Sequence, residues 1–120
     1  MANVVVLRGV LSRPPVERVL PSGDRIVTLE VTTRRDGESR AETAPVAWPG
    51  APGSVLTLDA GAEVVVIGHV ARRFFRAGGG TQSRTEVVAH GVYPGGRSKR
   101  LAAALGTAAE EVLAATQPAG

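Results

Sequence analysis

The residues best suited to ligand chemistry are two adjacent phenylalanines enclosed by arginines. Phe74 and Phe75 are the only phenylalanines of the chain, and they lie between Arg72 and Arg73 on one side and Arg76 on the other. An aromatic ring can stack on a nucleic-acid base, and a guanidinium group can hold a phosphate. Because neighbouring strand residues face opposite sides of a sheet, both rings can enter a core only where a bulge intervenes. At least one ring is therefore expected outside; packing of both at a sheet end or an oligomer interface is the competing explanation.

Trp48 is a second candidate for stacking, since it ends a short predicted strand directly before Pro49 and Gly50. Partial burial for packing explains such a position equally well. Arg34 and Arg35 begin a polar loop at 34–42, where they either contact phosphate or are simply solvated.

Catalytic and metal-binding patterns are missing from the sequence. The chain has no cysteine, and its two histidines, His69 and His90, lie in separate predicted strands. It contains no HExxH, GxSxG or GxxxxGK[ST] motif. The three glycines at 78–80 precede a strand rather than a helix, so they cannot present helix N-terminal amides to a phosphate. We predict a protein that is not an enzyme and needs no cofactor or metal.

Charge is distributed unevenly along the 120 residues. All 14 lysines and arginines lie at or before Arg100, whereas two of the 11 acidic residues, Glu110 and Glu111, come later. A basic first part favours a polyanionic partner, although a genome rich in G and C would also raise the arginine content. No apolar run approaches the ~18 residues of a membrane span, and the N-terminus lacks a secretory signal pattern. A cytoplasmic protein without membrane contact is expected.

The elements that must position these residues are mainly strands. Alternating apolar residues and turn signals predict strands at 3–12, 16–20, 25–34, 43–48, 63–75 and 83–94. A short helical segment is predicted at 54–62, with Ser54 as N-cap and Gly61 as C-cap, and a flexible hairpin tip at 76–82. This order predicts an all-β domain over residues 1–96, a five-stranded OB-fold barrel with long hairpins.

Residues 97–120 differ in character and predict a C-terminal α-helix and tail. Leu101, Leu105, Ala108 and Val112 recur at helical spacing, and Ser98 is a plausible cap. The face is narrow and rich in alanine, so this helix is expected to need the barrel or another copy of the chain to pack against.

With the strands placed, the chain resembles the bacterial single-stranded DNA-binding protein family. Four segments carry the resemblance: "NVVVLRGVLS" (3–12), "PPVERVLPSG" (14–23), "VIGHVARRFF" (66–75) and "TEVVAHGV" (85–92). The resemblance implies that Phe75 and Trp48 stack on bases, and that Phe74 lies at the barrel end. Arg35 and Glu42 stand where the family has two further aromatic residues, so affinity should be weaker or more sensitive to salt.

The family resemblance also bears on assembly and partners. It implies a homo-oligomer, a tetramer or dimer, for which the exposed edge of the first strand is a plausible contact. The family usually ends in an acidic tip that recruits other proteins; this chain ends in "ATQPAG", so recruitment through an acidic tail is not expected.

The expected function is binding and protection of single-stranded DNA at the nucleoid during replication, recombination or repair, with little sequence preference. The expected stacking residues are Trp48, Phe75 and Phe74. The expected phosphate contacts are Arg34, Arg35, Arg72, Arg73, Arg76 and Arg84. Two alternatives stay open. One is an OB-fold accessory protein that acts through protein contacts, like a primosomal factor, with the C-terminal helix as docking element. The other is an RNA-binding OB protein.

Overall fold

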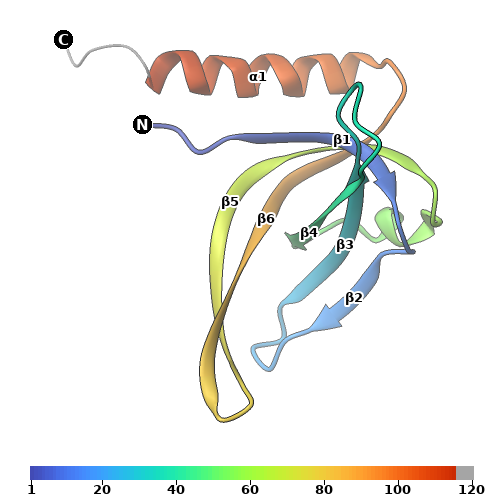
Figure 1. The fold of residues 1–120 in the computed structure, drawn as a ribbon. Coiled ribbons are helices and arrows are strands. Elements are labelled where there is room, and N and C mark those ends of the chain that lie inside the picture. Colours follow the sequence, from blue (N-terminus) through green and yellow to red (C-terminus); the bar gives the residue numbers. More distant parts are fainter. Residues whose placement is uncertain (116–120) are drawn as a thin grey trace.

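The computed structural model describes residues 1–115, which form strands and two helical segments (Figure 1). In chain order these are β1 (Val5–Leu11), β2 (Val16–Val19), β3 (Arg25–Thr33), β4 (Glu42–Pro49), the 3-10 helix η1 (Gly53–Thr57), β5 (Glu63–Ala77), β6 (Gly80–Pro94) and the helix α1 (Lys99–Ala115). The strands and the C-terminal helix occur where the sequence predicted them. The end of the tail, residues 116–120, lies outside the described residues.

The strands join into one sheet in the order β1-β5-β6-β4-β3-β2, and an additional pairing of β1 with β3 closes five of them into a ring. All pairs are antiparallel except the short contact of β4 with β6, in which Val46 and Ala47 lie opposite Val87 and Val88. Strand β2 stands outside the ring and pairs only with β3 among the described strands.

Apolar alternation in β3 explains where the core lies. Val27, Leu29 and Val31 are buried inside the ring, whereas Thr28 and Glu30 point outward. This is the pattern of a strand with one dry face and one wet face. The outward face of β3 therefore remains available as a polar surface.

The β5–β6 hairpin extends beyond the ring and reaches the lower edge of the view in Figure 1. The sequence predicted a flexible tip over 76–82, but the strands continue to a two-residue turn at Gly78 and Gly79. Both have positive φ, 59° and 80°, as a type I′ turn requires. Near the ring the register shifts between Ile67 and Gly68. A Cβ on Gly68 would lie 2.0 Å from the Val88 carbonyl oxygen, so only glycine fits there.

The segment before β5 differs from its predicted form. It is a short 3-10 helix that follows Pro52 without a side-chain cap, so Ser54 is not an N-cap. The helix ends at Thr57, and Gly61 is therefore not its C-cap. Gly61 instead adopts a φ of 88° and donates its backbone N–H to the Leu11 carbonyl at 2.7 Å, which ties this connection to β1.

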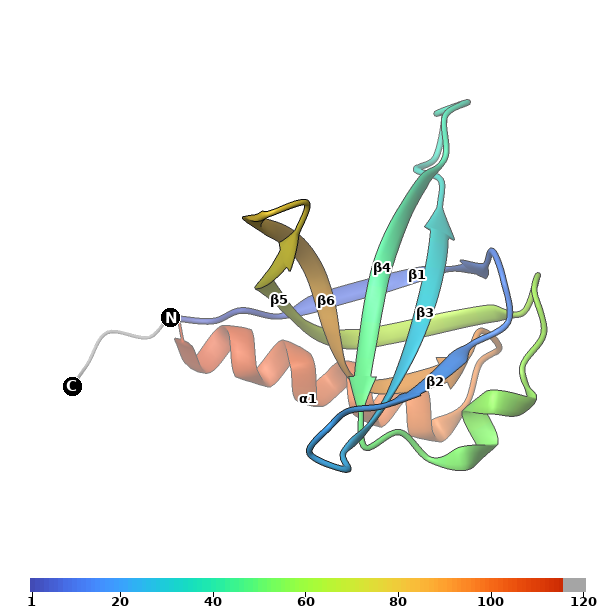
Figure 2. The same ribbon diagram turned by 90° about the horizontal axis from the view of Figure 1, so that it is seen from below.

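Helix α1 lies along the outside of β1 and β5 (Figure 2). The predicted cap is confirmed, because the Ser98 hydroxyl accepts a hydrogen bond from the Leu101 backbone N–H at 3.0 Å. Leu101 and Ala108 are buried against Val65 and Ile67 of β5. No helix among residues 1–115 is both long and apolar enough to span a membrane.

The predicted apolar face of the helix is only partly buried against the sheet. Leu101 and Ala108 are buried, whereas Leu105 and Val112 are 38% and 40% exposed. At 100° per residue they are turned by roughly 20° to 60° around the helix axis from the two buried side chains.

Candidate nucleic-acid interface

Each side chain of the β5–β6 hairpin can be assigned to one of its two faces, because the register is regular beyond Gly68. Arg73 lies opposite Arg84, and Phe75 lies opposite Gln82. These four residues share one face, since directly opposed residues of an antiparallel pair point to the same side. The reverse face carries Phe74.

A hollow of about 260 Å³ lies over the first face, lined by Arg18, Arg73, Phe75 and Arg84. A neighbouring hollow of about 220 Å³ shares Arg18 and Arg84 and continues over the outward surface of β3. We call the two together the arginine groove; its main polar and aromatic residues are Arg13, Arg18, Thr28, Glu30, Arg73, Phe75 and Arg84. The groove therefore joins the hairpin to the side of the ring.

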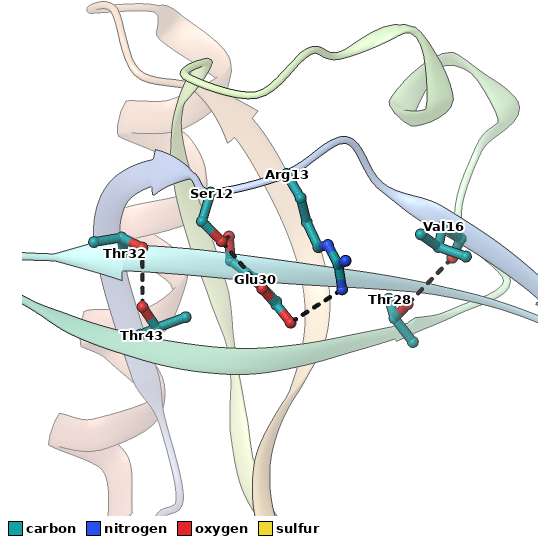
Figure 3. A network of polar contacts seen from close by, with 7 residues as sticks. All are labelled: Ser12, Arg13, Val16, Thr28, Glu30, Thr32 and Thr43. Atoms are coloured by element: carbon teal, nitrogen blue, oxygen red, sulfur yellow. Dashed lines mark hydrogen bonds and ion pairs between the residues drawn. The ribbon is translucent and has the colours of Figure 1, made fainter.

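Hydrogen bonds fix the part of the groove next to β3 (Figure 3). The Glu30 carboxylate accepts a hydrogen bond from the Ser12 hydroxyl at 3.2 Å and pairs with the Arg13 guanidinium at 3.5 Å. The Thr28 hydroxyl donates to the Val16 carbonyl at 3.3 Å. These contacts hold the segment that leads into β2 against β3, and with it the start of the strand that carries Arg18.

Glu86 organises the cationic side of the groove. Its side chain is only 7% exposed, and its two oxygens lie 3.9 Å from Arg73 and 3.6 Å from Arg84. Like charges directly opposite each other in a sheet repel, and this carboxylate offsets the repulsion.

Charges within the groove do not cancel. Four arginines, at positions 13, 18, 73 and 84, face two glutamates, Glu30 and Glu86, which leaves two positive charges in excess. Arg18 forms no ion pair with any of the residues that the structure describes. Among the four groove arginines, Arg18 is therefore the one whose guanidinium is most available to an anionic ligand.

Both phenylalanine rings are exposed. Phe75 is 40% exposed and lines the groove, whereas Phe74 is 65% exposed and lies on the reverse face. The expectation that Phe74 packs at the barrel end is therefore wrong, because the hairpin carries it beyond the ring. Arg72 and Arg76 are each two residues from Phe74 along β5, so they lie on the same face and point away from the groove.

The other predicted residues lie elsewhere. Trp48 is partly buried, packs against the core and lines a separate pocket of about 430 Å³ with Val55 and Tyr93. Arg34 lines a third hollow, and Arg35 pairs with Glu38 at 3.6 Å. The loop that follows them lies at the opposite end of the molecule from the hairpin tip (Figure 1). Of the nine predicted contacts, the structure brings together Phe75, Arg73 and Arg84.

Sequence reasoning missed Arg13 and Arg18 as groove residues. Pairing the two predicted strands as a hairpin would have found Arg18. In that register Arg18 lies opposite Ile26 and Val16 lies opposite Thr28. This register places Arg18 on the outward face that also carries Thr28 and Glu30. The approach of β2 to Arg84 is a tertiary contact that this pairing does not predict.

His69 and His90 meet across the hairpin base, with Nδ1 of His69 2.7 Å from Nε2 of His90. Within residues 1–115 there is no group of three or more side chains that could hold a metal ion.

No model of a known protein family matches the chain, and no curated protein matches it.

Proposed function

We propose that the chain is an OB-fold protein that binds single-stranded DNA with little sequence preference. The observation that carries the proposal is the arginine groove, which combines one exposed aromatic ring with an excess of positive charge. A closed ring of five strands with a long hairpin is the architecture expected of an OB barrel. Single-strand binding needs little more than this, since bases stack on rings while cations follow the backbone.

Phe75 is the proposed stacking platform. An exposed ring can receive a base only if that base is not already stacked on its neighbours, which favours single strands over duplexes. Every base has a flat face, so such a contact does not read sequence. Stacking of this kind contributes about 1–3 kcal/mol per base.

Arg18, Arg73 and Arg84 are the proposed phosphate contacts. Glu86 holds the last two in place, which lowers the entropy that a bound strand must remove from their side chains. Each phosphate neutralised on a single strand changes the slope of log affinity against log salt by about −0.7. Three such contacts predict a slope near −2.

One groove with one ring supports modest affinity. Several grooves on a homo-oligomer would act on the same strand, because linked sites raise the effective concentration of the second binding event. We therefore propose that the protein works as a dimer or tetramer, coating exposed strands during replication, recombination or repair.

Fluorescence anisotropy with labelled dT20, a dT20·dA20 duplex and U20, each at 50 mM and 200 mM NaCl, tests this proposal. We expect dT20 to bind, the duplex to bind at least about tenfold more weakly, and the affinity for dT20 to fall about 15-fold with the fourfold rise in salt. Equal binding of duplex and single strand would contradict the stacking role. Tighter binding of U20 than of dT20 would identify RNA as the ligand, and absence of binding to all three would refute the function.

A further inference from the structure

Helix α1 presents a second apolar stripe beside the one that packs on the sheet. We call it the outer stripe; it consists of Ala102, Leu105, Gly106, Ala109 and Val112, all exposed. Positions 102, 105, 109 and 112 follow the 3-4-3 spacing of a heptad seam, at which one helix packs against another. The sheet packs against the neighbouring stripe of Leu101, Ala104 and Ala108, so the outer stripe is left exposed within residues 1–115.

The charges of α1 are arranged unfavourably for a single helix. Lys99 and Arg100 open it, Glu110 and Glu111 lie near its end, and there is no acidic residue in its first turn and no basic residue in its last. The helix macrodipole favours the reverse, with acids at the start and bases at the end. A short alanine-rich helix that gives up this stabilisation must gain stability from packing.

An antiparallel copy of the same helix turns this arrangement into an attraction. Lys99 and Glu110 are eleven residues apart, so at 100° per residue they lie within about 20° of each other around the axis, on one flank of the outer stripe. If the two-fold axis passes between Leu105 and Gly106, Ala102 of one copy faces Ala109 of the other. Lys99 then lies within two residues, about 3 Å along the axis, of the level of Glu110.

Shape also fits a helix approaching at this point. A Cβ on Gly106 would meet no atom within 4 Å, so the surface at the proposed axis is open, and small residues there allow two backbones to come close. Beside the first half of the stripe lies a hollow of about 290 Å³, lined by Arg8, Gly95, Leu101, Ala102 and Leu105. It offers space for a large apolar side chain from the second copy.

We propose that the outer stripe is a homodimer interface in which α1 helices of two copies pack antiparallel. A second copy is the occupant that the charges select, because one surface carries both members of the complementary pair and a two-fold interface uses the same patch twice. This inference does not depend on the nucleic-acid function, since the arginine groove lies on other elements.

Charge reversal with the full chain is the decisive experiment. Sedimentation velocity over a concentration series, without nucleic acid, measures self-association of the wild type, Lys99→Glu, Glu110→Lys and the double variant. Each single reversal replaces two symmetric attractions by repulsions, so we expect it to weaken the dimer about tenfold. The double variant should return to the wild-type affinity.

The single reversals should not unfold the helix. Each one places a charge that the helix macrodipole favours, an acid near the N-terminus or a base near the C-terminus. Circular dichroism should therefore show no loss of helix in the variants that dissociate. Leu105→Glu should also dissociate the dimer, whereas the matched control Thr107→Glu, on the opposite side of α1, should not. A wild-type chain that stays monomeric, or a dimer that ignores Leu105→Glu and both reversals, would overturn the proposal; the latter result would place self-association on another surface, such as the edge of β1.

Discussion

The β5–β6 hairpin offers a comparison within one element, because each of its faces carries a phenylalanine and two arginines. On the groove face Phe75 stands with Arg73 and Arg84, and on the reverse face Phe74 stands with Arg72 and Arg76. The composition of the two faces is nearly the same. They differ in what lies opposite: the groove face meets β2 through Arg18 and has the buried Glu86, whereas Phe74 lies opposite Ser83 and is more exposed. A binding surface is thus defined here by its surroundings and not by its own residue types.

Removing one ring at a time should have the largest effect that distinguishes the two faces. Phe75→Ala should cost about 1–3 kcal/mol of binding free energy, equivalent to about a 5- to 150-fold loss of affinity for dT20. Phe74→Ala, the matched control one residue away, should change affinity less than about threefold. Anisotropy titrations at one salt concentration measure both. Equal losses from the two variants would show that the strand uses both faces of the hairpin.

The predicted strands owe their accuracy to local patterns. Alternation of Val27, Leu29 and Val31 with polar neighbours fixed both the existence of β3 and its buried face. The tight turn at Gly78 and Gly79 was missed because three consecutive glycines are compatible with a loose tip as well as with a type I′ turn.

The candidate site was less predictable because it depends on contacts between distant segments. The alternation of side chains along a strand placed Phe74 and Phe75 on opposite faces of the hairpin. It could not tell which ring lies in a hollow, because the hollow is formed with β2, more than 50 residues earlier in the chain. Trp48 carries the same side-chain chemistry as a stacking residue, yet it packs against the core in a different pocket. The position of a residue along a strand predicts the face on which its side chain lies. Only the tertiary arrangement shows what lies opposite that face.

Arginine substitutions test whether the two faces also differ in their contacts with phosphate. Arg18→Gln removes a groove cation that has no ion pair among residues 1–115, so it should reduce the salt slope by about 0.7 while leaving stability nearly unchanged. Arg76→Gln removes the same charge from the reverse face and should leave the slope unchanged. Affinities at four salt concentrations give both slopes. A smaller slope in Arg76→Gln than in Arg18→Gln would argue against the groove as the phosphate path.

Glu86→Gln is expected to have the smallest effect on affinity and opposite effects on binding and folding. Losing the carboxylate adds one net positive charge to the groove, which should strengthen binding of dT20 at low salt about two- to threefold. Arg73 and Arg84 are then left facing each other, so the free energy of unfolding should fall by about 1–3 kcal/mol.

Urea denaturation beside anisotropy separates the two effects of this variant. Glu38→Gln in the loop after β3, where Glu38 pairs with Arg35, removes the same charge from an exposed ion pair and serves as control. Weaker binding by folded Glu86→Gln would mean that Glu86 acts mainly by positioning its two arginines.

Observing the arginine side chains while a strand binds shows directly whether the arginine groove is the binding site. In ¹⁵N-correlated NMR spectra of the Nε–Hε groups, assigned by single Arg→Lys variants, we expect dT20 to shift the signals of Arg18, Arg73 and Arg84. Signals of Arg72 and Arg76 should stay in place. Shifts confined to Arg72 and Arg76, or equal shifts on both faces of the hairpin, would contradict the assignment of the arginine groove as the binding site.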